Sequence, residues 1–149
     1  MSSLKAFQVA AELAERQRDA ARQTLKDVQS ALQAAQAQLE QLAGYAGETQ
    51  GRWGMRAGAE VQPEVMYHHY QFMGRLDHAA SIQNGVVGDQ SARVQAAQRA
   101  LLDAELRLAS LRRAVEKRRN DFALQQQRRD QKQTDERAAL QYRNADQES

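Results

Sequence analysis

The amino-acid sequence opens with a strict seven-residue pattern of small and apolar residues. The first apolar position of each heptad holds Leu4, Ala11, Arg18, Leu25, Leu32, Leu39 and Ala46. The second apolar position, three residues later, holds Phe7, Ala14, Ala21, Val28, Ala35 and Leu42. A seven-residue repeat drifts around a straight helix, so it stays buried only in a left-handed supercoil with a partner helix. Because many of these residues are Ala and bury little area, the partner must run alongside for most of the length.

A second heptad series, later in the chain, supplies that partner. It occupies positions 66, 69, 73, 76, 80, 83, 87, 90, 94, 97, 101, 104, 108, 111, 115, 118 and 122. Residues 84–89 contain two glycines and could form a turn, which would give a three-helix protein. The register does not shift across them, and a turn of arbitrary length would usually shift it. We therefore expect one continuous helix.

The two series together predict the fold. The pattern lapses from Gly54 to Gln62, and Pro63 followed by Glu64 suits the first turn of a new helix. The sequence predicts an all-α fold, two long helices in an antiparallel coiled-coil hairpin, with the second helix overhanging at the C-terminus. We expect a single elongated domain over residues 1–149, with helix 1 at about 3–53, the turn at about 54–62 and helix 2 at about 64–142.

The predicted pairing follows from a turn centred near residue 59. Leu42 then faces Leu76, and Leu4 faces about Ala114. Beyond Phe122 the seam positions become polar, so the last 25 or so residues are expected to form a lone, highly charged helix.

Composition agrees with long helices and sets limits on function. The 149 residues include 5% aromatics, one Pro and no Cys, so disulfides and thiolate metal sites are excluded. The mean hydropathy is -0.79, and no apolar run approaches the roughly 18 residues that a membrane span needs. We expect a cytoplasmic protein without direct membrane insertion. The stretch from Arg107 to Arg143 is basic, with eleven Lys/Arg against five Asp/Glu.

Catalytic chemistry finds little support in the sequence. His68 and His69 are adjacent and point in different directions on a helix, and His78 is distant, so no metal site is expected. There is no nucleotide-binding P-loop motif, and the carboxylates fall on solvated faces. We predict no enzyme and no cofactor. The Arg-rich part of the second helix could bind nucleic-acid phosphates, but acidic residues interrupt it. A generic coiled-coil spacer or secretion chaperone is a further alternative.

Two short stripes flank the seam with spacings of four, three and four residues. They are Gln38, Leu42, Tyr45 and Thr49 on the first helix, and Phe72, Leu76, Ala79 and Gln83 on the second. The predicted pairing places the stripes side by side. Tyr45 and Phe72 could anchor a docking patch, since aromatic side chains dominate interface energetics, or they could merely widen the buried seam.

Several short motifs resemble those of the flagellar FliJ family. They are Leu4 and Phe7 followed by Leu13-Ala14-Glu15 and Asp19-Ala20-Ala21; Gln38-x3-Leu42-x2-Tyr45; Tyr70-Gln71-Phe72-x3-Leu76-x2-Ala79; and Asp130-Gln131-Lys132-x2-Asp135-Glu136-x-Ala138. Their order and spacing extend over nearly the whole chain. The resemblance implies a coiled-coil component of the flagellar type III protein export apparatus. It implies a monomer similar to the central stalk of rotary ATPases, cytoplasmic and peripherally associated with the inner membrane at the flagellar base.

The resemblance also implies partners and contact residues. The partners are the export ATPase hexamer, whose ring the protein enters and helps to assemble, the export-gate membrane protein, and export chaperones; no nucleic acid is expected. The gate-contacting surface corresponds to Gln38, Leu42, Tyr45, Phe72, Leu76 and Ala79. The ring-contacting part corresponds to Asp130, Gln131, Lys132, Asp135 and Glu136. Thr49 stands where the family pattern has Tyr, and Gln83 where it has His, so the gate contact is weaker or fits an altered partner.

Overall fold

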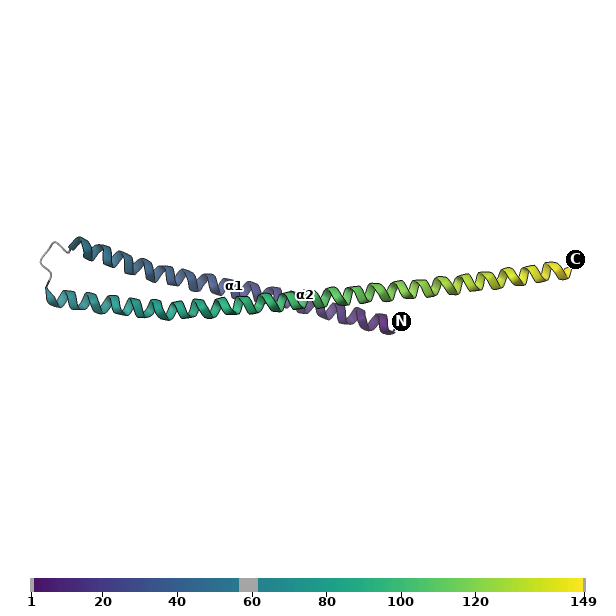
Figure 1. The fold of residues 1–149 in the computed structure, drawn as a ribbon, viewed down its shortest axis with the longest axis horizontal. Helices are drawn as coiled ribbons and strands as arrows, with labels where there is room; N and C mark the ends of the chain where they lie inside the picture. Colours follow the sequence, from purple (N-terminus) through teal and green to yellow (C-terminus); the bar gives the residue numbers. More distant parts are fainter. Residues whose placement is uncertain (1, 57–61, 149) are drawn as a thin grey trace. The chain divides into compact units, whose positions relative to one another are not determined.

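The computed structural model describes residues 2–56 and 62–148, which form two helices. Helix α1 spans Ser2–Arg56 and helix α2 spans Pro63–Glu148, with no strand in the described part of the chain (Figure 1). The helices pack against each other, so the predicted all-α hairpin is confirmed. Helix α2 continues through residues 84–89, which confirms two helices rather than three. Most of the predicted turn, residues 57–61, lies outside the described residues.

Helix α2 begins where the sequence places its start. The backbone N–H groups of Val65 and Met66 donate to the carbonyl oxygen of Gln62 at 3.0 and 3.1 Å. Pro63 occupies the first turn, where its missing N–H leaves no hydrogen bond unmade. Glu64 in the same turn favours the helix because its negative charge lies near the positive end of the helix dipole.

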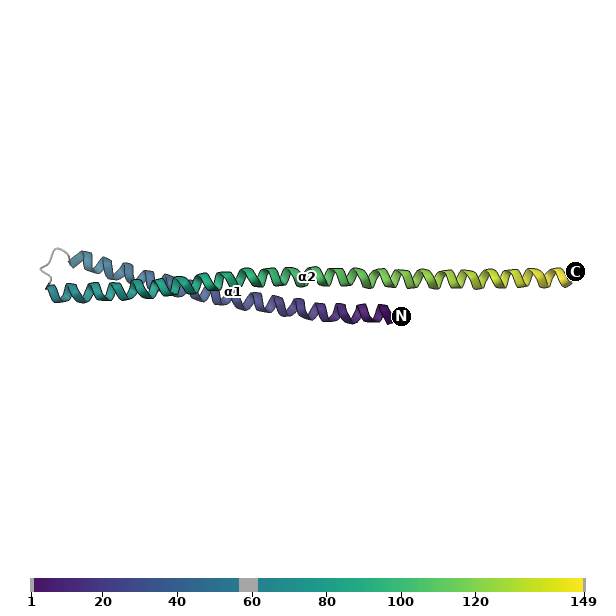
Figure 2. The same cartoon turned by 60° about the horizontal axis from the view of Figure 1, so that its bottom comes forward.

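The chain divides into two compact units. Unit 1 comprises Met1–Asp19 and Asp103–Ser149, and unit 2 comprises Ala20–Leu102. In each unit a segment of α1 lies beside a segment of α2 (Figure 1, Figure 2). The pairing is antiparallel: in unit 1, Arg118 lies over the ring of Phe7 and Arg112 pairs with Glu15, so partners on α2 decrease in number as those on α1 increase.

The seam follows the predicted heptads closely. All thirteen predicted α1 positions from Leu4 to Ala46 are buried or half-buried, and Thr49 and Trp53 continue the series. On α2, every predicted position from His69 to Val115 is likewise shielded, whereas Met66, Arg118 and Phe122 are exposed. The most buried side chains are Ala14, Ala35, Ala97 and Leu108. Three of these four are Ala, which allows the close helix approach that the Ala-rich seam predicts.

The predicted pairing of Leu4 with Ala114 is wrong. Leu4 lines a hollow with Arg118 and Phe122, which lie about one and two helical turns further along α2 than Ala114. Side-chain direction accounts for about two residues of this shift, because every Cα–Cβ bond in a helix tilts toward the N-terminus of that helix and moves the contact by about one position on each helix. In an antiparallel pair, the Cα atoms of two residues whose side chains meet therefore lie at different heights along the helix axes. A pairing counted from the turn alone then gives too low a residue number for the partner on α2.

Candidate protein-binding surfaces

The six residues predicted to contact the export gate all lie in unit 2, and we call them the flank patch. It consists of Gln38, Leu42, Tyr45, Phe72, Leu76 and Ala79. Leu42 and Leu76 are half-buried members of the seam, and Ala79 is also half-buried. Tyr45 and Phe72 remain 52% and 45% exposed. Each of these two aromatic residues directly precedes a seam position, so its ring borders the seam without filling it.

A glutamine in the seam connects the two helices beside the flank patch. The Nε2 group of Gln83 donates to the carbonyl oxygen of Ala35 at 2.9 Å and to Oε1 of Gln38 at 3.0 Å. The contact therefore joins one residue of each predicted stripe. Polar residues at seam positions favour one alignment of the helices over others, so Gln83 helps to hold the two sides of the flank patch in register.

Stacked rings near the connection between the helices are a feature that the sequence reading missed. The rings of Trp53 and His69 stack at a centroid distance of 4.1 Å and an interplanar angle of 3°. Tyr70 lies beside His69 at 5.9 Å, and Tyr67 accepts a hydrogen bond from Nε2 of Gln71 at 2.8 Å. The sequence did carry a signal for this contact, because Trp53 and His69 both lie at seam positions of the heptad series of their helices.

The five residues predicted to contact the ATPase ring lie on the last part of α2, in unit 1, and we call them the tail set. It consists of Asp130, Gln131, Lys132, Asp135 and Glu136, all exposed. Gln131 and Asp135, and Lys132 and Glu136, are four residues apart, so each pair lies on one side of the helix. Thr134 donates its hydroxyl to the carbonyl oxygen of Asp130 at 2.9 Å. The tail set therefore presents a mixed-charge surface to solvent.

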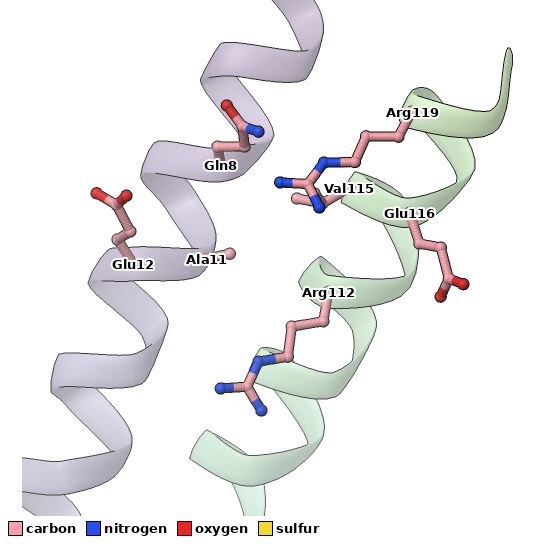
Figure 3. A pocket seen from close by; sticks show the side chains of 7 residues that line it. All are labelled: Gln8, Ala11, Glu12, Arg112, Val115, Glu116 and Arg119. Atoms are coloured by element: carbon pink, nitrogen blue, oxygen red, sulfur yellow. The ribbon is translucent and has the colours of Figure 1, made fainter. Parts of the chain in front are cut away.

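A second hollow in unit 1 lies between α1 and α2. It is lined by Gln8, Ala11, Glu12, Arg112, Val115, Glu116 and Arg119. The side chains of Arg112 and Arg119 extend from α2 toward α1, with Ala11 and Val115 between the helices (Figure 3). Arg112 pairs with Glu15 at 3.9 Å. This hollow has charges of both signs and no nucleophile beside a base among its lining residues.

Metal-binding and membrane-spanning features are absent from the described residues. Within residues 2–56 and 62–148, no group of three or more His, Cys, Asp or Glu side chains could hold a metal ion. Neither helix, over the same residues, has a stretch apolar and long enough to cross a membrane.

Comparisons with known proteins agree with this architecture. The family model described as "Flagellar FliJ protein" matches residues 3–147. No curated protein matches the sequence. A solved structure of a YscO homolog from Chlamydia trachomatis is similar, with a TM-score of 0.73 and 17% identity, over 100% of this chain and 96% of that one. At this identity the similarity shows a shared fold.

Proposed function

This chain belongs to the flagellar FliJ family, and we propose that it acts as a central stalk of the flagellar type III protein export apparatus. Family membership makes it a component of flagellar protein export. As a stalk, the chain enters the hexameric ring of the export ATPase, promotes assembly of that ring, and links it to the export gate and to export chaperones. It is cytoplasmic, monomeric when free, and peripherally associated with the inner membrane at the flagellar base.

The contact with the export gate is assigned to the flank patch. The observation that carries this assignment is the exposure of Tyr45 and Phe72, about half of each side chain, on a chain with only eight aromatic residues. Exposed rings bordering a packed seam add little to folding, yet aromatic side chains provide much of the binding free energy at protein interfaces. Leu42 and Leu76, three and four residues from these rings on the same helices, are half-buried in the seam, and Gln83 donates a hydrogen bond to Gln38 of the flank patch.

The contact with the ATPase ring is assigned to the tail set. In unit 1, α2 continues past the first residues of α1 (Figure 2), and every α2 residue from 116 to 148 is exposed. Where no other helix of the chain covers α2, its surface is available to a surrounding ring on all sides. The mixed charges of the tail set would favour polar contacts there rather than a permanent apolar interface.

The double variant Tyr45→Ala with Phe72→Ala tests the gate contact. We expect its affinity for the purified cytoplasmic domain of the export-gate protein to fall about tenfold or more, because both aromatic anchors are lost. Tyr142→Ala is the matched control, since Tyr142 is an exposed aromatic residue outside the flank patch. Isothermal titration calorimetry measures the affinity, and far-UV circular dichroism measures the fold.

Two results would contradict the gate contact. One is an affinity unchanged by the double variant. The other is a loss of thermal stability comparable to that of Leu101→Ala, which removes a half-buried seam residue, because the rings would then belong to the core.

A further inference from the structure

The polar contact that aligns the two helices of unit 2 has a second copy one heptad further along α2. Gln83 and Gln90 are both half-buried and occupy the same heptad position. Gln83 donates to the carbonyl oxygen of Ala35 and to Oε1 of Gln38. If α2 moved by one heptad along α1, Gln90 would occupy the place of Gln83 and meet the same two acceptors. This register-fixing contact can therefore be made in two registers.

The ion pair between the helices of unit 1 is repeated in the same way. Arg112 pairs with Glu15 at 3.9 Å, and Arg119, seven residues later, also extends toward α1 (Figure 3). The same movement would bring Arg119 to the place of Arg112, beside Glu15. A movement by one heptad in the opposite direction would bring Glu105 there, and two carboxylates would face each other. The charges therefore favour movement in one direction only.

The apolar part of the α2 seam also tolerates this movement. One of its two seam positions carries an aliphatic side chain in five successive heptads, namely Val87, Val94, Leu101, Leu108 and Val115. A shift by one heptad replaces each of the first four with another aliphatic residue. It would break the stack of Trp53 on His69 and the contact of Arg118 with Phe7, so the observed register is the more stable one. The shifted register is then a minor state, which a partner can select by binding it more tightly.

We propose that α2 moves along α1 between these two registers, by one heptad or about 10 Å of helix, and that the flank patch is complete only in the observed register. Three residues of the flank patch lie on α1 and three on α2, so the movement displaces one half of the patch along the other. A partner that contacts both halves would bind the observed register and release the shifted one. This consequence for the export gate rests on the proposed function.

Paired cysteines test the movement in the full-length chain, which has no cysteine of its own. Leu32 and Val94 line one hollow, so Leu32→Cys with Val94→Cys reports the observed register. Leu101 lies one heptad beyond Val94, so Leu32→Cys with Leu101→Cys reports the shifted register. The control is Leu32→Cys with Gln98→Cys, because Gln98 is exposed and lies between the other two positions. We expect the Leu101 pair to form its disulfide about tenfold faster than the Gln98 pair, and more slowly than the Val94 pair.

A charge variant tests the ion pair of the shifted register. Arg119→Gln removes the side chain that would replace Arg112 beside Glu15. It should slow disulfide formation by the Leu101 pair and leave the Val94 pair unchanged. Arg113→Gln, which removes an exposed charge one residue from Arg112, is the control and should change neither rate. A Leu101 pair that oxidises no faster than the Gln98 pair would overturn the movement, and so would equal effects of the two Arg variants.

The oxidised chains separate this inference from the proposed function. The chain locked through Leu32 and Val94 should bind the purified cytoplasmic domain of the export-gate protein like the unaltered chain. The chain locked through Leu32 and Leu101 should bind it about tenfold more weakly or worse. Equal binding by both locked chains would overturn the inference and leave the gate contact standing. No binding by the unaltered chain would overturn the proposed gate contact, and the disulfide rates alone would then decide whether α2 moves.

Discussion

Two stretches of α2 in unit 1 have the same secondary structure and opposite surroundings. In residues 103–115, Ala104, Leu108, Leu111 and Val115 are shielded at heptad spacing. From 116 to 148 every residue is exposed, including the apolar Leu124 and Leu140. Apolar residues alone therefore do not pack a helix. They must recur at the seam positions and must have a partner helix opposite them.

The difference has an energetic meaning. The first stretch is stabilised by burial against α1, which is worth on the order of 1.5–3 kcal/mol for a fully buried Leu. Apart from the contact of Arg118 with the ring of Phe7, the second stretch depends on helix propensity and on exposed charge pairs worth a few tenths of a kcal/mol each. The two stretches should therefore respond very differently to the same substitution.

The largest effect is expected from Leu108→Ala. Leu108 is 3% exposed, so its truncation should lower the free energy of unfolding by about 3 kcal/mol, through lost burial and an unfilled cavity. The same change at the exposed Leu140, on the same helix, should stay within about 0.5 kcal/mol. Chemical denaturation followed by circular dichroism measures both values. Similar losses for the two variants would mean that residue 140 also has a partner.

A smaller effect is expected from Gly85→Ala in unit 2. A Cβ atom added at Gly85 meets nothing within 4 Å, so Ala fits without strain. Ala is the better helix former, and the variant should gain about 1 kcal/mol in free energy of unfolding. The converse exchange in the exposed stretch, Ala139→Gly, should reduce helical content without moving the main unfolding transition. A destabilised Gly85→Ala variant would show that α2 needs flexibility at this point.

The seam was predictable because it depends only on spacing. The heptad series identified the shielded positions on both helices, and its unbroken register correctly favoured a helix through residues 84–89. Two glycines and two β-branched residues oppose the helix there, yet the packing of Gln83 and Val87 against α1 compensates for their weak propensity.

The contacts across the seam were less predictable, because they depend on alignment and side-chain direction. The Trp53 and His69 stack and the Gln83 to Gln38 hydrogen bond require a register known to within one turn. The sequence could not decide whether Tyr45 and Phe72 were buried, since a residue beside the seam can turn toward it or toward water. The predicted roles of the flank patch and the tail set come from family resemblance, and spacing alone gave no binding partner.

The smallest effect on stability is expected from deleting residues 123–149. Every described residue in this range, 123–148, is exposed, so the thermal midpoint should change little. If the tail set enters the ATPase ring, the same deletion should abolish stimulation of ring assembly and ATP hydrolysis, while gate binding through Tyr45 and Phe72 is retained. Alanine substitution of the five tail-set residues is the matched control, because it keeps the helix and removes the side chains. A large fall in the thermal midpoint would mean that α1 supports more of α2 than its exposure indicates, and undiminished ATPase stimulation would place the ring contact elsewhere on the chain.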